Sequence, residues 1–217
     1  MSVLIEAAVD SAVAAERAVL EGAGRLEVCS QLEVGGLTPS LELLRQSLSL
    51  GVPVVAMSRL RAGDFVYDRP ELEQLMADAA VMREAGAHGI VCGMLTRDHT
   101  IDDGAVTRMA QICSGVDSVF HRAFDDTPDA REALETLIER GVTRVLTSGH
   151  AVTAAEGVAS LATLAEEAAG RIQILPGGGI RAHNVVDIVR RTGVTQVHAR
   201  GTEAGVIASI KLALGAV

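Results

Sequence analysis

Short apolar runs alternate with longer amphipathic stretches from one end of the chain to the other. Eight runs have the length and the Val, Ile and Leu content of strands. They cover residues 3–9, 25–29, 52–58, 89–95, 118–121, 144–147, 172–175 and 196–199. Stretches rich in Ala, Leu and Glu separate them and predict helices, for example over residues 11–21, 39–48, 70–84, 129–140 and 183–191.

The order of these elements predicts the fold. Several helical stretches open with Ser, Asp or Thr-Pro and end at a Gly that leads into the next apolar run. Eight β-α units without a break in composition predict an α/β protein with a single (β/α)8 TIM barrel over residues 1–217. A doubly wound open sheet is the alternative, but its usual Gly-rich turn is absent after the first strand.

Composition and charge narrow the classes of partner. A net charge of −9 disfavours nucleic acid and anionic membranes, because both need a basic surface. No apolar run approaches the roughly 18 residues of a membrane-spanning helix, and Glu6 and Asp10 stand where a signal peptide would carry basic residues. The three cysteines, Cys29, Cys92 and Cys113, are far apart and odd in number, which indicates reduced thiols. We therefore expect a cytoplasmic protein.

The alternation of side chains along the first two strands predicts a polar barrel interior. If the apolar residues of each strand face the helices, Glu6 and Glu27 face inward on adjacent strands. Buried carboxylates need cations or shared protons, and the candidates for this are Arg59, His121, Arg122 and His198. One interpretation is a structural ion-pair network that fills the barrel. The other is an active site in which Glu6, Glu27 or His121 transfers protons near neutral pH.

The stretch "SVFHRAFDDTP" places several polar residues directly after the fifth strand. Chemistry in a TIM barrel lies at the carboxyl ends of the strands, so either His121 or Arg122 points into the mouth of the barrel. Alternation alone does not decide between these two residues. Asp125 either pairs with Arg122 or caps the helical segment that follows.

Two further segments predict an anion site at the mouth. The glycines of "LPGGGI", which are Gly177, Gly178 and Gly179, expose backbone N–H groups ahead of a predicted helix, in the region where barrels often hold phosphate. A tight turn that needs a positive φ is the alternative. The hydroxyl of Ser148, after the sixth strand, lies beside that site. The remaining candidate ligand-binding residues are Arg59, Arg61, Asp64, Arg122, Asp125 and His198.

Cys29 is the one cysteine that we expect at the inward-facing end of a strand. A soft metal such as Cu(I) could bind its thiol together with a Met or a His. A lone buried cysteine that packs as a small apolar side chain is the alternative.

The motifs "RLEVCSQLEVGGLTPS", "RAGDFVYD", "FHRAFD", "RVLTSG" and "GRIQILPGGGI" resemble those of the CutC family in sequence and in order. The resemblance runs from Leu4 to about His198. It implies a cytoplasmic TIM barrel that forms homodimers or higher homo-oligomers and takes part in copper homeostasis, with Cu(I) as a ligand. Cys29 matches the cysteine of the "ELCS" motif of the family.

The chain also departs from the family pattern. Ala8 stands where many members have a cysteine, and "SRLRAGDF" differs from the usual "IRPRGGDF" at Ser58, Leu60 and Ala62. The loop after His198 is shorter than usual. Three interpretations follow as alternatives: intracellular copper binding at Cys29, an enzyme that acts on a small anionic or phosphorylated substrate at the mouth of the barrel, or a non-catalytic scaffold whose polar mouth is structural.

Overall fold

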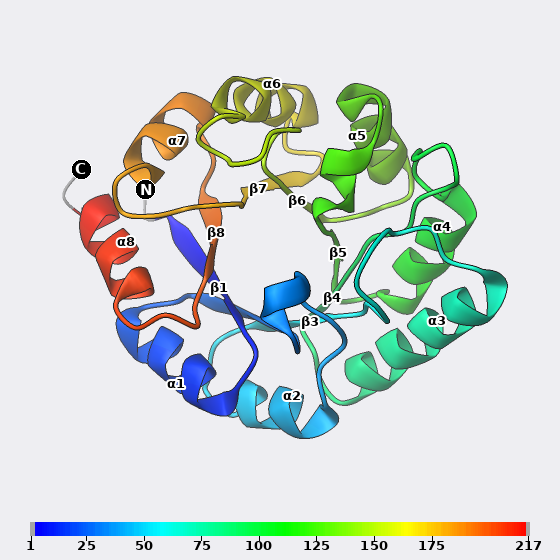
Figure 1. Ribbon diagram of the computed structural model, residues 1–217, viewed down its shortest axis with the longest axis horizontal. Helices are drawn as coiled ribbons and strands as arrows, with labels where there is room; N and C mark the ends of the chain where they lie inside the picture. The colour runs from blue at the N-terminus through cyan, green and yellow to red at the C-terminus, as the bar shows by residue number, and fades with distance from the viewer. Residues whose placement is uncertain (1–2, 216–217) are drawn as a thin grey trace.

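The computed structural model describes residues 3–215 and contains eight parallel strands in the order β7-β6-β5-β4-β3-β2-β1-β8. The strands are β1 Leu4–Val9, β2 Arg25–Val28, β3 Val54–Met57, β4 Gly89–Cys92, β5 Asp117–Phe120, β6 Arg144–Thr147, β7 Gln173–Pro176 and β8 Gln196–Arg200. They form a nearly closed barrel in which β7 and β8 lie side by side (Figure 1). The predicted TIM barrel is therefore confirmed, and the open-sheet alternative is wrong.

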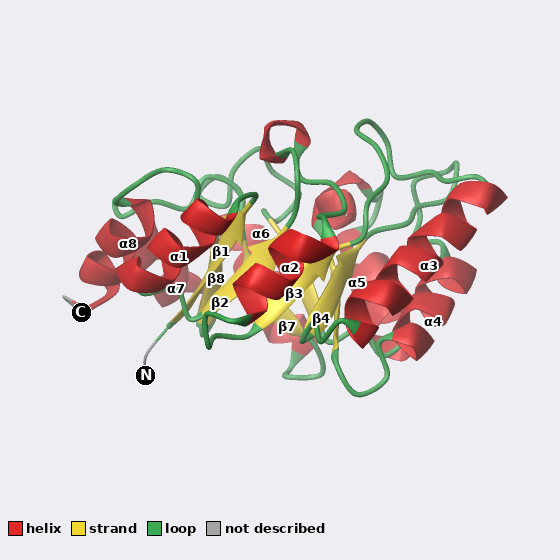
Figure 2. Cartoon of the chain, turned by 90° about the horizontal axis from the view of Figure 1, so that it is seen from below, coloured by secondary structure: helices red, strands yellow, loops and turns green. Residues whose placement is uncertain are grey.

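Eight helices form a ring outside the strands, as Figures 1 and 2 show. They are α1 Ala12–Glu21, α2 Leu41–Leu48, α3 Arg69–Glu84, α4 Asp103–Ile112, α5 Ala130–Glu139, α6 Val158–Ala168, α7 Val185–Thr192 and α8 Val206–Gly215. Five of them begin after a side chain that accepts a backbone N–H hydrogen bond, as N-cap residues do: Ser11, Ser40, Asp68, Asp102 and Asp129. No helix within residues 3–215 is both long and apolar enough to cross a bilayer.

Two strands are three residues shorter than their apolar runs predict. β3 covers only residues 54–57 of the predicted 52–58, and β4 ends at Cys92, although the apolar run continues to Leu95. Met94 and Leu95 are nevertheless buried in the layer between strands and helices. A run of apolar residues indicates which residues are buried and does not show where the hydrogen bonds of the sheet end. Because buried residues continue into these loops, the apolar pattern alone predicts strands that are too long.

Alternation along the strands divides the buried residues as predicted. Ile5, Ala7 and Val9 of β1 pack into the large cluster between the barrel and the helices. Ala8 and Cys29 belong to a second, smaller apolar cluster inside the barrel. The interior also carries buried charged side chains, so this core is only partly apolar.

Candidate functional site

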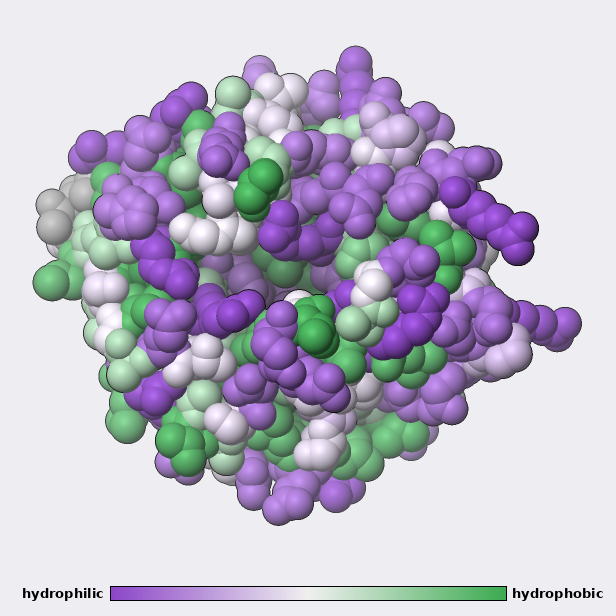
Figure 3. All heavy atoms as spheres, viewed as in Figure 1, coloured by the Kyte–Doolittle hydropathy of each residue, from purple (hydrophilic) through white to green (hydrophobic). Residues whose placement is uncertain are grey.

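The carboxyl-terminal mouth of the barrel contains a cavity of about 460 Å³. The short 3-10 helix η1, Leu32–Val34, follows β2 and lies over the barrel opening in Figure 1, and Figure 3 shows hydrophilic side chains around a hollow on this face. The ionisable groups that line the cavity are Glu27, His121, His198, Arg59, Arg122, Arg181, Arg200 and Glu203. The cavity therefore combines acid–base groups with an excess of positive charge.

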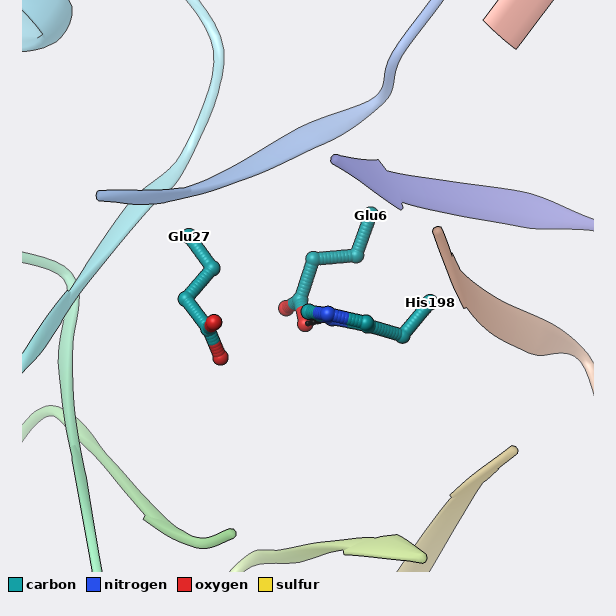
Figure 4. Close-up of side chains that lie close together, drawn as sticks. All are labelled: Glu6, Glu27 and His198. Atoms are coloured by element: carbon teal, nitrogen blue, oxygen red, sulfur yellow. Dashed lines mark hydrogen bonds and ion pairs between the residues drawn. The ribbon is translucent and has the colours of Figure 1, made fainter. Parts of the chain in front are cut away.

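Three side chains from neighbouring strands meet inside the barrel at this cavity, and two of them line it. Glu6 comes from β1, Glu27 from β2 and His198 from β8, and Figure 4 shows them pointing toward one another. Ligand atoms of the three residues lie within 4.8 Å of one another. Both carboxylates are fully or nearly fully buried. The predicted pair of inward-facing carboxylates is thus present, with His198 as its imidazole neighbour.

Glu6 is held in its charged form. Its Oε1 lies 2.7 Å from Nδ1 of His198, and its Oε2 forms an ion pair with the Arg25 guanidinium. Burial alone would raise the pKa of Glu6, but the His198 hydrogen bond and the Arg25 charge outweigh it and lower that pKa to about 2. Glu6 is therefore an ionised carboxylate that orients the imidazole ring.

Glu27 has the opposite character. Its Oε2 is buried and has no hydrogen-bond partner within residues 3–215. Burial and the nearby Glu6 charge raise the pKa of Glu27 to about 7, against the smaller lowering effect of His198. Although burial opposes it, the negative charges of Glu27 and Glu6 raise the pKa of His198. Glu27 is therefore the carboxyl group of this site whose pKa lies near neutral pH, and His198 beside it favours its protonated form.

A belt of hydrogen-bonded polar side chains forms the floor of this site. Arg25 donates to Gln196 at 2.7 Å, Gln196 donates to Gln173 at 2.9 Å, and Arg144 donates to the same Gln173 oxygen at 3.3 Å and to Asp117 at 2.7 Å. Sequence reasoning missed Arg25 as the partner of Glu6. Arg25 lies two residues before Glu27 and thus on the same strand face, which is the signal that could have found it.

His121 and Arg122 both line the cavity, and they have different surroundings. His121 is buried, accepts the Ala123 N–H at Nδ1 over 3.1 Å and packs against the Phe65 ring at 4.8 Å between ring centroids. Burial and the Arg59 charge lower the pKa of His121 to about 3, so the ring is neutral at physiological pH. Val119 of β5 belongs to the apolar cluster inside the barrel, and His121 lies two residues later, so His121 continues the inward-facing residues of that strand.

Arg122 belongs to a hydrogen-bonded group centred on Asp125. Arg122 lies in the 3-10 helix η2, Arg122–Asp126, and its Nε donates to Asp125 at 2.8 Å. Asp125 also accepts from the hydroxyls of Thr147 and Ser148 and from the backbone N–H groups of Ser148 and His150. Although burial would raise the pKa of Asp125, these bonds lower it. Asp125 therefore pairs with Arg122, which is one of the two alternatives that the sequence left open. This ion pair fixes the Arg122 guanidinium at the cavity wall.

The glycine segment is only partly what the sequence predicts. Gly177 donates its N–H to Thr147 and does not line the cavity, whereas Gly178 and Gly179 line it with positive φ values of 91° and 76°. The N–H groups of Gly178, Gly179 and Ile180 have no hydrogen-bond partner within residues 3–215. Since α7 begins only at Val185, the expected helix start is wrong. The free N–H groups belong to the loop itself.

The structure separates the two arginines of the β3–α3 loop. Arg59 is buried in the cavity wall, where its guanidinium donates to the carbonyl oxygens of Val34, Gly36 and Gly63. Arg61 lies outside the cavity lining and forms ion pairs with Glu71 at 2.6 Å and Asp64 at 2.9 Å. Arg61 and Asp64 are therefore not brought together with the other predicted site residues.

Cys29 provides a poor donor set for copper. Its thiol is fully buried in the interior apolar cluster and donates to the Val9 carbonyl at 3.6 Å, and burial raises the pKa of the thiol well above its usual range. Cu(I) prefers soft thiolate and thioether ligands. Met57 is the neighbouring soft residue in that cluster, and no described His or second Cys shares a metal-ligand group with Cys29.

Glu6, Glu27 and His198 form the one group of three or more His, Cys, Asp or Glu residues with metal-ligand spacing among residues 3–215. Arg25 already pairs with Glu6, and the charges of Arg25 and Arg144 both act on this group. These cations already balance the carboxylates. The group is therefore better suited to hold protons than to hold a metal ion.

Comparison with known proteins identifies the family of this chain. The CutC family pattern matches residues 3–203. A family protein CutC from Rhizobium meliloti (strain 1021) is 44% identical over 194 residues, which cover 89% of this chain and 79% of that protein. The Copper homeostasis protein cutC homolog of Homo sapiens is 43% identical over 198 residues, which cover 90% of this chain and 72% of that protein.

Solved structures agree with this assignment. A CutC structure from Streptococcus agalactiae superimposes with a TM-score of 0.87 at 32% identity and covers 93% of this chain and 100% of that one. Phosphoribosylanthranilate isomerase from Thermotoga maritima reaches a TM-score of 0.65 at 11% identity, covering 99% of this chain and 100% of that one, which shows the barrel fold alone. Because the family pattern spans nearly the whole chain, this protein belongs to the CutC family and is a homologue of copper homeostasis proteins.

Proposed function

We propose that the mouth of the barrel is an active site that binds a small anionic compound and transfers protons to and from it. The observation that carries this proposal is Glu27, a buried carboxyl group without a partner for Oε2, in the wall of a cavity lined by arginines. A group whose pKa lies at about 7 can both accept and return a proton near neutral pH.

His198 and Glu6 support Glu27 in this role. Glu6 binds Nδ1 of His198, so the imidazole has a fixed orientation and its other nitrogen is left for proton exchange. The positive charge that builds up on His198 is balanced by the ionised Glu6. A carboxylate, an imidazole and a second carboxyl of higher pKa form an acid–base unit of the kind used in general catalysis.

Arg122 and the glycine loop after β7 supply the anion site. A Cβ atom on Gly178 would lie 3.3 Å from Nη1 of Arg122, so this guanidinium lies against the glycine loop. Nη1 of Arg122 has no hydrogen-bond partner within residues 3–215, and the loop N–H groups beside it are free as well. Successive free N–H groups in a loop with positive φ form an anion-binding concavity. A phosphate or carboxylate group fits this pair of donors.

The proposal is tested by thermal shift with inorganic phosphate and a panel of small phosphate monoesters. A ligand at about 100 times its Kd adds about 2.7 kcal/mol of stability, so binding is visible. We expect Arg122→Met to abolish the shift and Arg190→Met, at an exposed arginine of α7, to leave it unchanged. Equal shifts in the parent and Arg122→Met would refute the anion site.

Copper handling is the second candidate function, and the names of the relatives favour it. In that case Cys29 and Met57 are the soft side chains available inside the barrel. Titration of the reduced protein with Cu(I) distinguishes the two candidates. Affinity that depends on Cys29 and not on Arg122 would support copper binding over the anion site.

A further inference from the structure

Two buried hydrogen-bond donors in the cavity wall lack an acceptor. They are Nε2 of His121 and Nε of Arg59, and neither has a partner within residues 3–215. Both residues line the cavity that Glu27 also lines. Buried polar groups are nearly always hydrogen-bonded, so an acceptor oxygen is expected at each donor: from water or a ligand at His121, and from water, a ligand or the neighbouring unpartnered Tyr67 hydroxyl at Arg59.

The surrounding backbone fixes His121 as a donor. Because Nδ1 accepts the Ala123 N–H, the hydrogen of the neutral ring is on Nε2. The ring edge with Nδ1 and Cε1 lies so close to Gly93 that a Cβ atom there would overlap it. A neutral, buried imidazole of this kind donates a hydrogen bond and does not take up a proton at physiological pH.

Arg59 is fixed in a similar way. Its Nη1 donates to Val34 and Gly36 at 3.0 and 3.3 Å, and its Nη2 donates to Gly63 at 3.2 Å. These carbonyls belong to the loops that follow β2 and β3, so the guanidinium is held by two segments. Its planar group also stacks on the Phe65 ring at 4.9 Å. Donors that are held in place before a ligand arrives stabilise negative charge at little reorganisation cost.

These donors complement the unpartnered oxygen of Glu27. Glu27 has an unpartnered buried oxygen that can take a proton, His121 and Arg59 have unpartnered buried donors, and all three residues line the same cavity. We infer that the substrate is a small anionic carbonyl compound, that Glu27 removes a proton from the carbon next to the carbonyl, and that His121 and Arg59 donate hydrogen bonds to the carbonyl oxygen. This inference rests on the proposed function of the same site.

The step is balanced without an oxidant or a reductant. Glu27 takes the proton, the electron pair of the broken C–H bond forms a C=C bond, and the π pair of the carbonyl moves to its oxygen. The donors stabilise the resulting oxyanion. Glu27 or His198 then returns a proton to the same carbon or, where that carbon carries a hydroxyl group, to the neighbouring carbon while the hydroxyl proton passes to the oxyanion. The product has the same composition as the substrate, so the reaction class is epimerisation or isomerisation.

Carbon-bound hydrogen exchange tests this step. The protein is incubated with hydroxyacetone phosphate in D2O, and loss of the C–H signals is followed by proton NMR, with pyruvate as the carboxylate counterpart of the probe. We expect exchange of at least one probe in the parent protein. Exchange of the first alone would identify a phosphate ligand, and exchange of the second alone a carboxylate ligand. His121→Phe should slow exchange about a hundredfold, as the loss of one oxyanion donor does, and His121→Gln should retain part of the rate.

A binding measurement on the parent protein provides a second test that needs no variant. 2-Phosphoglycolate resembles the oxyanion intermediate, whereas methyl phosphate offers only the anionic group. We expect 2-phosphoglycolate to bind about a hundredfold more tightly, because analogues of the reacting state exploit such donors. Equal affinities, or phosphate binding without exchange of either probe, would overturn this inference and leave the anion site intact. Absence of phosphate binding together with absence of exchange of either probe would instead overturn the proposed function.

Discussion

Nδ1 of His198 lies 2.7 Å from Oε1 of Glu6, across the junction of β8 and β1. This contact gives two carboxyl groups of the same residue type opposite properties. Glu6 is paired with His198 and Arg25 and stays ionised, whereas Glu27, one strand away, keeps its proton to about pH 7. Paired groups whose pKa values are driven apart in this way are typical of acid–base sites.

Replacement of Glu27 should change how stability depends on pH. Glu27 loses its proton near pH 4.5 when unfolded and near pH 7 when folded, so the free energy of unfolding falls as pH rises through that window. The shift corresponds to about 3 kcal/mol. Glu27 and Glu6 raise the pKa of His198, so deprotonation of His198 also lowers the free energy of unfolding as pH rises. The charges of Arg25 and Arg144 act against the raised pKa of Glu27.

We expect Glu27→Gln to remove most of this fall. Urea unfolding at about pH 5 and about pH 8 measures it, with Glu42→Gln at an exposed position of α2 as the matched control. A parent and a Glu27→Gln variant with parallel pH profiles would show that Glu27 titrates normally.

The Glu6–Arg25 pair should behave as a single unit. Glu6→Gln or Arg25→Met leaves one buried charge without its partner, and each change should destabilise the protein by about 3 kcal/mol or more. The double variant should lose much less than the sum, since neither charge remains unpaired. A double-mutant cycle by denaturant unfolding measures the coupling, and additive losses would indicate that the two charges are independent.

Asp125 should control both stability and anion binding. Asp125→Asn replaces one acceptor oxygen by an NH2 group among donors from Thr147, Ser148 and His150, so we expect a loss of about 2 kcal/mol or more. Arg122 loses its ion pair, and the phosphate-induced thermal shift should weaken. Asp126→Asn, at the exposed neighbouring residue, is the control for both readouts.

Gly93 should tolerate no side chain. A methyl group there would overlap the His121 ring and contact Ala123 at 2.8 Å. Gly93→Ala should therefore destabilise the protein by about 1–3 kcal/mol, as overpacking does, and displace the imidazole. Gly104→Ala in α4 meets only Asp102 at 3.7 Å and should be neutral or stabilising. Thermal unfolding of both variants compares them directly, and equal melting temperatures would contradict the packing argument.

The thiol of Cys29 should be dispensable for the site. Because it is buried among apolar side chains and its pKa is raised, we expect Cys29→Ser to retain the phosphate-induced shift and the Cu(I) affinity of the parent. Competitive titration with a Cu(I) chelator under reducing conditions measures the affinity. A large loss on Cys29→Ser, with Cys113→Ser as the control at another buried cysteine, would favour copper binding instead.

Local pattern was sufficient for much of the fold. Strand-sized apolar runs, glycines at helix ends and alternation in β1 and β2 predicted the barrel, and they also placed Glu6 and Glu27 inside it. These features depend on neighbours along one element, so a single sequence contains them. The same reasoning extended β4 to Leu95 and placed the glycine loop at a helix start, because burial and turn chemistry do not fix where a ladder ends.

The sequence by itself determined the barrel, the inward direction of the two glutamates and the presence of arginines and glycines at the strand ends. Only the tertiary structure decided which cation meets which anion: Arg25 with Glu6, Arg122 with Asp125, and Arg61 with Glu71 outside the cavity. Long charged side chains reach several neighbours, so their partners depend on the register of adjacent strands and on loop paths. That choice leaves Glu27, and not Glu6, as the carboxyl group that titrates near neutral pH.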